Sequence, residues 1–134
     1  MKVLVDTTVW SETLRRQPGA KREEIAQALE KLIERGQVIL IGPVRQELLS
    51  GVRDRKIFDS LKHKLRGFPD ESLRTEDYES AADFYNRCRE KGVQGSHVDL
   101  LICAMALNRK AAIFTLDRDF GHYAKVIPIQ LFKW

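Results

Sequence analysis

The chain has 134 residues, of which 43% are hydrophobic and 31% are charged, and its formal net charge is +4. These values are typical of a globular protein of this size, and we expect a single domain spanning residues 1–134. The longest apolar stretch is far shorter than the roughly 20 residues needed to cross a bilayer, and the N-terminus lacks a signal-peptide pattern. We therefore expect a cytoplasmic protein with no membrane partner.

Short apolar strands alternate with helices in the first half of the chain. Strands are predicted at residues 2–5 and 38–41, which are too apolar for a half-exposed strand. Helices are predicted at residues 8–15 and 20–34, with a break at Gln17-Pro18-Gly19 between them. A further helix starts at Gly42-Pro43 and ends at Gly51, and the basic segment up to Leu65 is also expected to be helical.

The second half continues the alternation. A short strand is expected near Leu73, and Thr75 is predicted to be the N-cap of a helix that runs to about Glu90. The remaining predicted elements are a helix over 96–108, a strand over 112–116, a turn or short helix over 117–123, and an edge strand over 126–131. Apolar strands that alternate with helices predict an α/β fold with a mainly parallel sheet.

Four acidic residues stand where predicted strands or helices begin or end, each flanked by apolar sequence. They are Asp6, Glu47, Asp99 and Asp117. In a parallel sheet, sites form beyond the carboxyl ends of the strands. Asp6 and Asp117 follow strands, Glu47 lies early in the helix after a strand, and the helix of Asp99 is able to start at the same edge. We therefore expect the four side chains to converge.

Carboxylates that converge without a basic partner repel one another, which raises their pKa values unless a cation offsets the charge. Hard oxygen ligands suit Mg²⁺ or Mn²⁺, and one or two such ions support hydrolysis at phosphorus. Each acid also has an ordinary alternative that the sequence leaves open. These are a helix cap at Asp6, a capping box from Ser96 to Asp99, a surface charge offset by Arg45 at Glu47, and a turn at Asp117 and Asp119.

The positive charge is concentrated between residues 53 and 66, where six basic residues stand against two aspartates. The basic residues are Arg53, Arg55, Lys56, Lys62, Lys64 and Arg66. Their segment carries 6 − 2 = +4, the whole net charge of the chain. Two interpretations stay open: a solvated helix face, or a surface that contacts RNA phosphates.

Four segments together resemble the PIN-domain ribonucleases, and among them the VapC-type toxins of type II toxin–antitoxin pairs. They are residues 3–10 (VLVDTTVW), 43–51 (PVRQELLSG), 98–106 (VDLLICAMA) and 114–120 (FTLDRDF). The resemblance implies a three-layer α/β/α sandwich with a mainly parallel, roughly five-stranded sheet. It also implies that Asp6, Glu47, Asp99 and Asp117 bind the metal, with Asp119 as a more variable accessory position. Thr7, Thr8 and Thr115 match positions whose hydroxyls support the acidic site.

By this resemblance the expected function is a Mg²⁺- or Mn²⁺-dependent endoribonuclease that acts as a toxin. The expected partners are RNA, a VapB-like antitoxin, and a second copy of the chain in a homodimer, assembling with antitoxin into a heterotetramer or larger complex. Two alternatives stay open. One is an RNA- or protein-binding module of the same fold without catalysis, and the other is a PIN ribonuclease that processes RNA rather than acting as a toxin.

Overall fold

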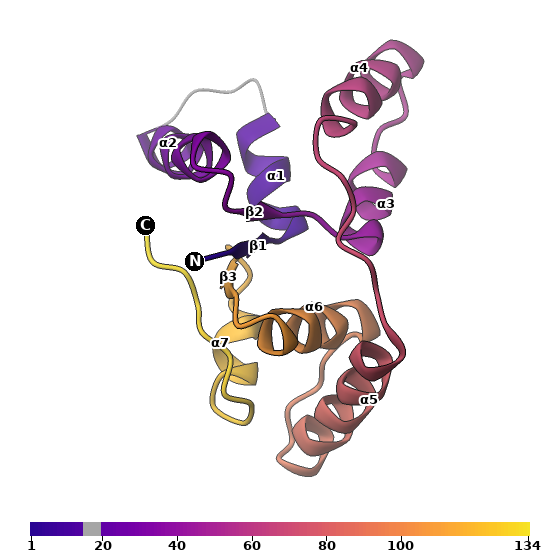
Figure 1. Ribbon diagram of the computed structural model, residues 1–134, viewed down its shortest axis with the longest axis vertical. Helices are drawn as coiled ribbons and strands as arrows, with labels where there is room; N and C mark the ends of the chain where they lie inside the picture. The colour runs from indigo at the N-terminus through magenta and orange to yellow at the C-terminus, as the bar shows by residue number, and fades with distance from the viewer. Residues whose placement is uncertain (15–19) are drawn as a thin grey trace.

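The computed structural model describes residues 1–14 and 20–134 (Figure 1). Its elements are β1 (Val3–Val5), α1 (Thr7–Leu14), α2 (Ala20–Glu34), β2 (Val38–Ile39), α3 (Gly42–Ser50), α4 (Arg55–Leu65), α5 (Thr75–Glu90), α6 (His97–Asn108), β3 (Ala112–Phe114) and α7 (Asp119–Tyr123). The order of helices and strands agrees with the prediction. The predicted break at Gln17-Pro18-Gly19 lies outside the described residues.

β1 is the central strand of a parallel sheet with the order β2-β1-β3. Single parallel bridges extend this sheet on both sides, where Leu40 pairs with Asp70 and Ile113 pairs with Leu131. Within the described part of the chain, the sheet thus has three strands and a bridging segment at each edge. This arrangement agrees with the expected α/β fold and its mainly parallel sheet.

The outer segments are shorter than the strands predicted there. The strand expected near Leu73 is a single bridge at Asp70, and the strand expected over 126–131 is a single bridge at Leu131. Pro128 lacks an N–H group and cannot donate to a ladder. The N–H groups of residues 126 and 127 close a turn after α7 instead.

Helices cover both faces of the sheet (Figure 1). α1 and α2 lie on one side of β1, while α6 and α7 lie on the other, and α5 packs along α6. α3 follows the end of β2, and α4 packs against α3. The result is the expected α/β/α sandwich. No helix within residues 1–14 and 20–134 is both long and apolar enough to span a membrane.

α6 is the central helix of the core, since every residue from Leu100 to Ala106 is buried. A helix that is apolar on all sides must be covered by other elements, here the sheet and α5. Its start is fixed by Ser96, whose Oγ accepts a hydrogen bond of 3.0 Å from the N–H of Asp99. This cap is the capping interaction that the sequence left open, and it places Asp99 in the first turn.

Asp77 is fully buried and joins the start of α5 to the end of α6. Its carboxylate receives two hydrogen bonds from the guanidinium of Arg109, at 2.8 and 2.9 Å, and one of 2.9 Å from the amide of Asn108. It also accepts from the N–H of Arg74 at 2.8 Å, so the helix cap is one residue before the predicted Thr75. The Arg109 bonds hold the pKa of Asp77 well below its usual range.

Candidate metal centre

The acidic residues singled out in the sequence lie at the carboxyl-terminal edge of the sheet. Asp6 follows β1 directly and is buried, with 5% of its surface exposed. Its N–H donates to the carbonyl of Phe114, the last residue of β3, at 2.9 Å. This bond continues the parallel pairing of β1 and β3 by one residue, so the segments after both strands leave the sheet side by side.

Two threonine hydroxyls hold the Asp6 carboxylate. Thr8 Oγ1 and Thr115 Oγ1 donate to the same oxygen, Oδ2, at 2.9 and 2.8 Å. Each hydroxyl also accepts a backbone N–H, from Leu116 and Asp117 respectively, at 3.0 Å. Because an ionised carboxylate can only accept, both hydroxyls donate to Asp6 Oδ2, and Oδ1 takes part in neither of these two bonds.

These same bonds explain why β3 ends two residues before the predicted end of the 112–116 strand. The N–H groups of residues 116 and 117 are directed to the threonine hydroxyls rather than to a neighbouring strand. These two backbone N–H groups thus hold the threonine hydroxyls that contact Asp6.

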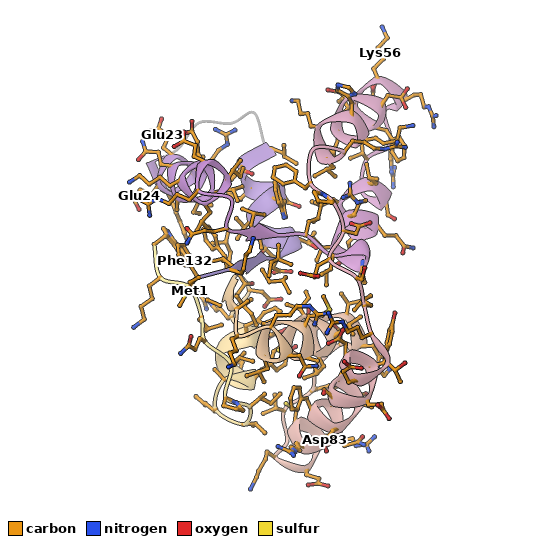
Figure 2. The ribbon with its side chains drawn as sticks, in the orientation of Figure 1. Met1, Glu23, Glu24, Lys56, Asp83 and Phe132 are labelled. Carbon is orange, nitrogen blue, oxygen red and sulfur yellow. The ribbon has the colours of Figure 1, made fainter. Side chains whose placement is uncertain are left out.

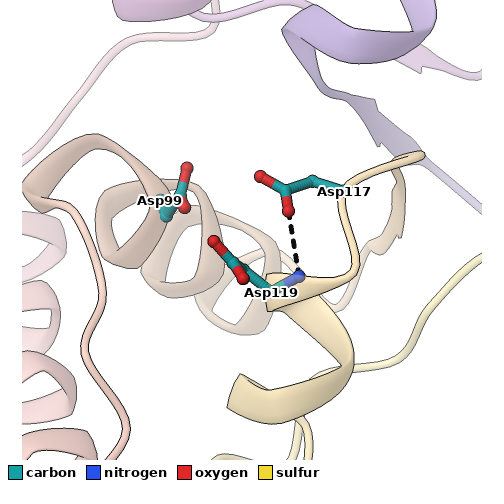
Figure 3. A group of neighbouring side chains, drawn as sticks. All are labelled: Asp99, Asp117 and Asp119. Atoms are coloured by element: carbon teal, nitrogen blue, oxygen red, sulfur yellow. Dashed lines mark hydrogen bonds between the residues drawn. The ribbon is translucent and has the colours of Figure 1, made fainter.

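Asp99, Asp117 and Asp119 form a compact group (Figure 3). One carboxylate oxygen of each lies within 4.8 Å of the others, and the three side chains point toward a common space. Asp117 Oδ1 accepts the N–H of Asp119 at 2.9 Å, which fixes the turn that starts α7. Asp99 and Asp117 are half-buried, whereas Asp119 is exposed.

The surroundings of Asp99 disfavour the charged form of its carboxyl group. Burial raises the pKa of Asp99, and the neighbouring charges of Asp6 and Asp117 raise it further. Hydrogen bonds from Tyr123 and Ser96 oppose this rise in part. Asp6 lies outside the compact group of three, although its charge contributes to the raised pKa of Asp99.

Glu47 lies at the rim of the site and not inside the compact group. It is exposed on α3, and its Oε2 accepts a hydrogen bond of 3.2 Å from Thr7 Oγ1. Since Thr7 is adjacent to Asp6 in the chain, this bond ties Glu47 to the residue beside Asp6. Arg45 does not offset its charge, because the Arg45 guanidinium is paired with Asp70 at 2.9 Å.

Tyr123 is a site residue that the sequence reasoning missed. Its hydroxyl donates a hydrogen bond of 2.7 Å to Asp99 Oδ2 from 24 residues further along the chain. Burial raises the pKa of Tyr123, and the bond to Asp99 raises it further, so the hydroxyl stays protonated. No spacing rule links the two residues, because the fold of α7 against the start of α6 creates the contact.

The basic segment forms α4 and the residues that flank it, with Asp54 capping the helix by accepting the N–H of Ile57 at 3.0 Å. An open groove runs between α1, α3 and α4. It is lined by Leu14, Glu47, Leu48, Ile57, Lys56 and Lys64, among other residues. Two of the six basic residues therefore share a groove with an acid at the rim of the site. Figure 2 shows Lys56, in the first turn of α4, extending outward.

The donor set fits a hard divalent cation. It consists of carboxylate oxygens, with hydroxyl and backbone groups that orient them, and oxygen ligands are those that Mg²⁺ and Mn²⁺ prefer. Thr8 and Thr115 orient Asp6, and Tyr123 orients Asp99. Such outer-shell hydrogen bonds accompany metal ligands in proteins.

Comparison with known proteins places this geometry in a family. A family model described as PIN domain matches residues 3–126. The chain is 29% identical over 132 residues to VapC ribonuclease Mb1587 of Mycobacterium bovis and to ribonuclease VapC11 of Mycobacterium tuberculosis, with 96% of each chain covered.

Solved structures show the same fold. The crystal structure of FitAcB from Neisseria gonorrhoeae matches with a TM-score of 0.79 at 23% identity, covering 98% of this chain and 96% of that one. VapBC2 from Rickettsia felis, bound to a DNA fragment from their promoter, matches with a TM-score of 0.81 at 17% identity, covering 100% and 99%. The resemblance stated from four sequence segments is confirmed, and the chain belongs to the PIN domain family.

Proposed function

We propose that this protein is a Mg²⁺- or Mn²⁺-dependent endoribonuclease and the toxin of a toxin–antitoxin pair. The observation that carries the proposal is the group formed by Asp99, Asp117 and Asp119, whose oxygens lie within 4.8 Å of one another beside Asp6. The curated relatives are named as ribonucleases, which supports RNA as the substrate.

Asp6, Asp99 and Asp117 would hold the ion, with Asp119 as a further ligand at the exposed side. A divalent ion in such a place supplies a hydrolytic water of lowered pKa and balances negative charge at phosphorus. Glu47, at the rim, would complete the ligand set or position the water. Cleavage would leave 5′-phosphate and 3′-hydroxyl ends.

The remaining residues have supporting roles in this proposal. Thr8 and Thr115 fix the rotamer of Asp6, so the carboxylate is oriented before a substrate arrives. Thr7 keeps Glu47 at the mouth of the site. The basic residues of the Arg53–Arg66 segment would guide the RNA backbone along the groove that starts at Glu47.

The proposed regulator is a VapB-like antitoxin, because the solved structures of similar fold include VapBC proteins. A segment of the antitoxin would cover the acidic centre, with an Arg side chain facing the carboxylates through paired hydrogen bonds. That side chain would compete with the cation and the RNA together. A homodimer of this chain, bound to antitoxin in a heterotetramer or larger complex in the cytoplasm, completes the proposal.

The test is cleavage of transfer, ribosomal and messenger RNA by the purified protein with Mg²⁺, with Mn²⁺ and with EDTA. We expect cleavage with either ion, none with EDTA, and none from Asp6→Asn or Asp117→Asn. Asp83→Asn, an exposed change on α5, is the matched control and should retain full activity. Cleavage that persists in EDTA or in Asp6→Asn would contradict the proposal. RNA binding without cleavage under any condition would favour the non-catalytic alternative.

A further inference from the structure

Tyr123 contacts the acidic centre from a position that none of the four sequence segments includes. It is the last residue of α7 and only 1% of its surface is exposed. Its hydroxyl donates to Asp99 Oδ2 at 2.7 Å. A buried phenol that donates to a half-buried carboxylate restricts the rotation of that carboxylate, because turning away would leave the hydroxyl without its acceptor.

The Tyr123 ring is held in place on two sides. Phe120 packs edge-on against it, with ring centroids 5.2 Å apart. On another side the ring lies against the backbone of Gly95, where an added Cβ would be 3.1 Å from Cε1 and 3.3 Å from the hydroxyl oxygen of Tyr123. The same Cβ would come within 2.3 Å of Leu100 Cδ2. Glycine at position 95 thus permits the close approach between the loop before α6 and the tyrosine.

We propose that Tyr123 is a positioning residue of the metal centre, which acts by holding Asp99 turned toward Asp117 and Asp119. The proposal rests on the metal site of the proposed function and extends it to a residue outside the acidic set. Tyr123 does for Asp99 what Thr8 and Thr115 do for Asp6, because in each case a hydroxyl donates to one carboxylate oxygen and so holds the side chain. Gly95 is part of the arrangement because it gives the ring its space.

The experiment measures Mn²⁺ binding by titration calorimetry, together with kcat/KM for RNA, in the wild type and in Tyr123→Phe. This change keeps the ring and its packing and removes only the hydroxyl. We expect the dissociation constant for Mn²⁺ to rise by about 10- to 100-fold, as is typical when an outer-shell partner is removed, and kcat/KM to fall with it. Tyr78→Phe, at an exposed tyrosine on α5, is the control and should change neither quantity.

Two further variants separate positioning from a merely structural role. In an Asp99→Asn background, Tyr123→Phe should weaken Mn²⁺ binding little further, because its effect passes through Asp99. Gly95→Ala keeps the hydroxyl, but its Cβ would lie 2.3 Å from Leu100 Cδ2 and 3.1 Å from Tyr123 Cε1, so Leu100 must turn away and the ring must also shift. We expect it to weaken Mn²⁺ binding through the ring shift, and it provides a second route if Tyr123→Phe folds poorly.

The outcomes distinguish this inference from the function on which it rests. If the wild type binds Mn²⁺ and cleaves RNA while Tyr123→Phe does both equally well, the positioning role is overturned and the proposed function stands. If Tyr123→Phe weakens Mn²⁺ binding by the same factor in the Asp99→Asn background as in the wild-type background, its effect does not pass through Asp99. That result also overturns the inference. A wild type that binds no Mn²⁺ overturns both.

Discussion

The Oγ1 hydroxyl of Thr115 donates a hydrogen bond of 2.8 Å to Oδ2 of Asp6, although the two residues are 109 positions apart in the chain. The contact follows from the parallel pairing of β1 with β3, which places Val5 opposite Phe114. Residues just beyond the two strand ends are therefore neighbours. A carboxylate after one strand and a hydroxyl after the other are enough to give an oriented, partly desolvated carboxylate.

Thr115→Val should lower nuclease activity because valine keeps the shape of the side chain and loses the hydroxyl. The change removes one of the two donors to Asp6 Oδ2 and leaves the N–H of Asp117 without its acceptor. We expect kcat/KM for RNA to fall by about 10- to 100-fold. Thr115→Ser, which retains the hydroxyl, is the control and should stay close to the wild type. Equal activity of the valine and serine variants would show that the hydroxyl has no role.

Asp99→Asn should abolish cleavage and yet stabilise the metal-free protein. The charged form of Asp99 is disfavoured by burial and by Asp6 and Asp117, which is why its pKa is raised. Asparagine removes that charge and keeps an oxygen that accepts from Tyr123. We expect the free energy of unfolding in EDTA to rise by a few tenths to about 1 kcal/mol. The measurement is urea unfolding with and without Mn²⁺, and a lower stability in EDTA would contradict the prediction.

Much of this arrangement could be predicted from the sequence because strand ends in parallel sheets converge. The positions of Asp6 and Asp117 directly after apolar strands predicted that both would lie at the carboxyl-terminal edge of the sheet, and the Ser96 cap places Asp99 in the first turn of its helix. Periodicity and turn residues also predicted the order of the elements, since the core helix α6 and strands β1 and β3 are apolar throughout.

Contacts that depend on side-chain packing between distant elements were not predictable in the same way. Tyr123 reaches Asp99 only because the turn after β3 places α7 against the start of α6, and Gly95 is needed for a close approach that no local pattern reveals. The outer strands were overestimated because β-branched residues at 126 and 127 favour a strand, whereas their N–H groups close a turn in the fold. Glu47 lies outside the group formed by Asp99, Asp117 and Asp119, and the sequence pattern did not distinguish it from the other acids.

Lys56 and Lys64 should contribute to RNA affinity in a salt-dependent way if the groove beside α4 carries the RNA backbone. Removing one lysine–phosphate interaction with single-stranded RNA should reduce the slope of log affinity against log salt by about 0.7. The measurement uses the inactive Asp6→Asn protein with Lys56→Gln, Lys64→Gln or both. Lys31→Gln, on α2 close to Met1 and away from the groove, is the matched control. Slopes equal to that of the control would indicate that α4 is a solvated helix face.

Asp77→Ala should be strongly destabilising, because it removes the buried carboxylate that accepts two hydrogen bonds from the mostly buried guanidinium of Arg109 and leaves it, within the described part of the chain, only the Ser72 carbonyl and a longer pairing with Glu71. Breaking a buried pair from one side costs about 3–5 kcal/mol. Asp83→Ala, which breaks the exposed Asp83–Arg87 pair on the same helix, should cost less than about 1 kcal/mol.

The stabilisation by Asp77 should also depend on pH, because the pKa of its carboxyl group is lowered in the folded state. Its contribution to the free energy of unfolding is fully present above the unfolded pKa near 4 and is lost as the pH falls below that value. Urea unfolding from pH 7 down to pH 3 should therefore show that the difference in the free energy of unfolding between the wild type and Asp77→Ala narrows below about pH 4. A difference that stays constant with pH would mean that the carboxylate charge does not stabilise the fold.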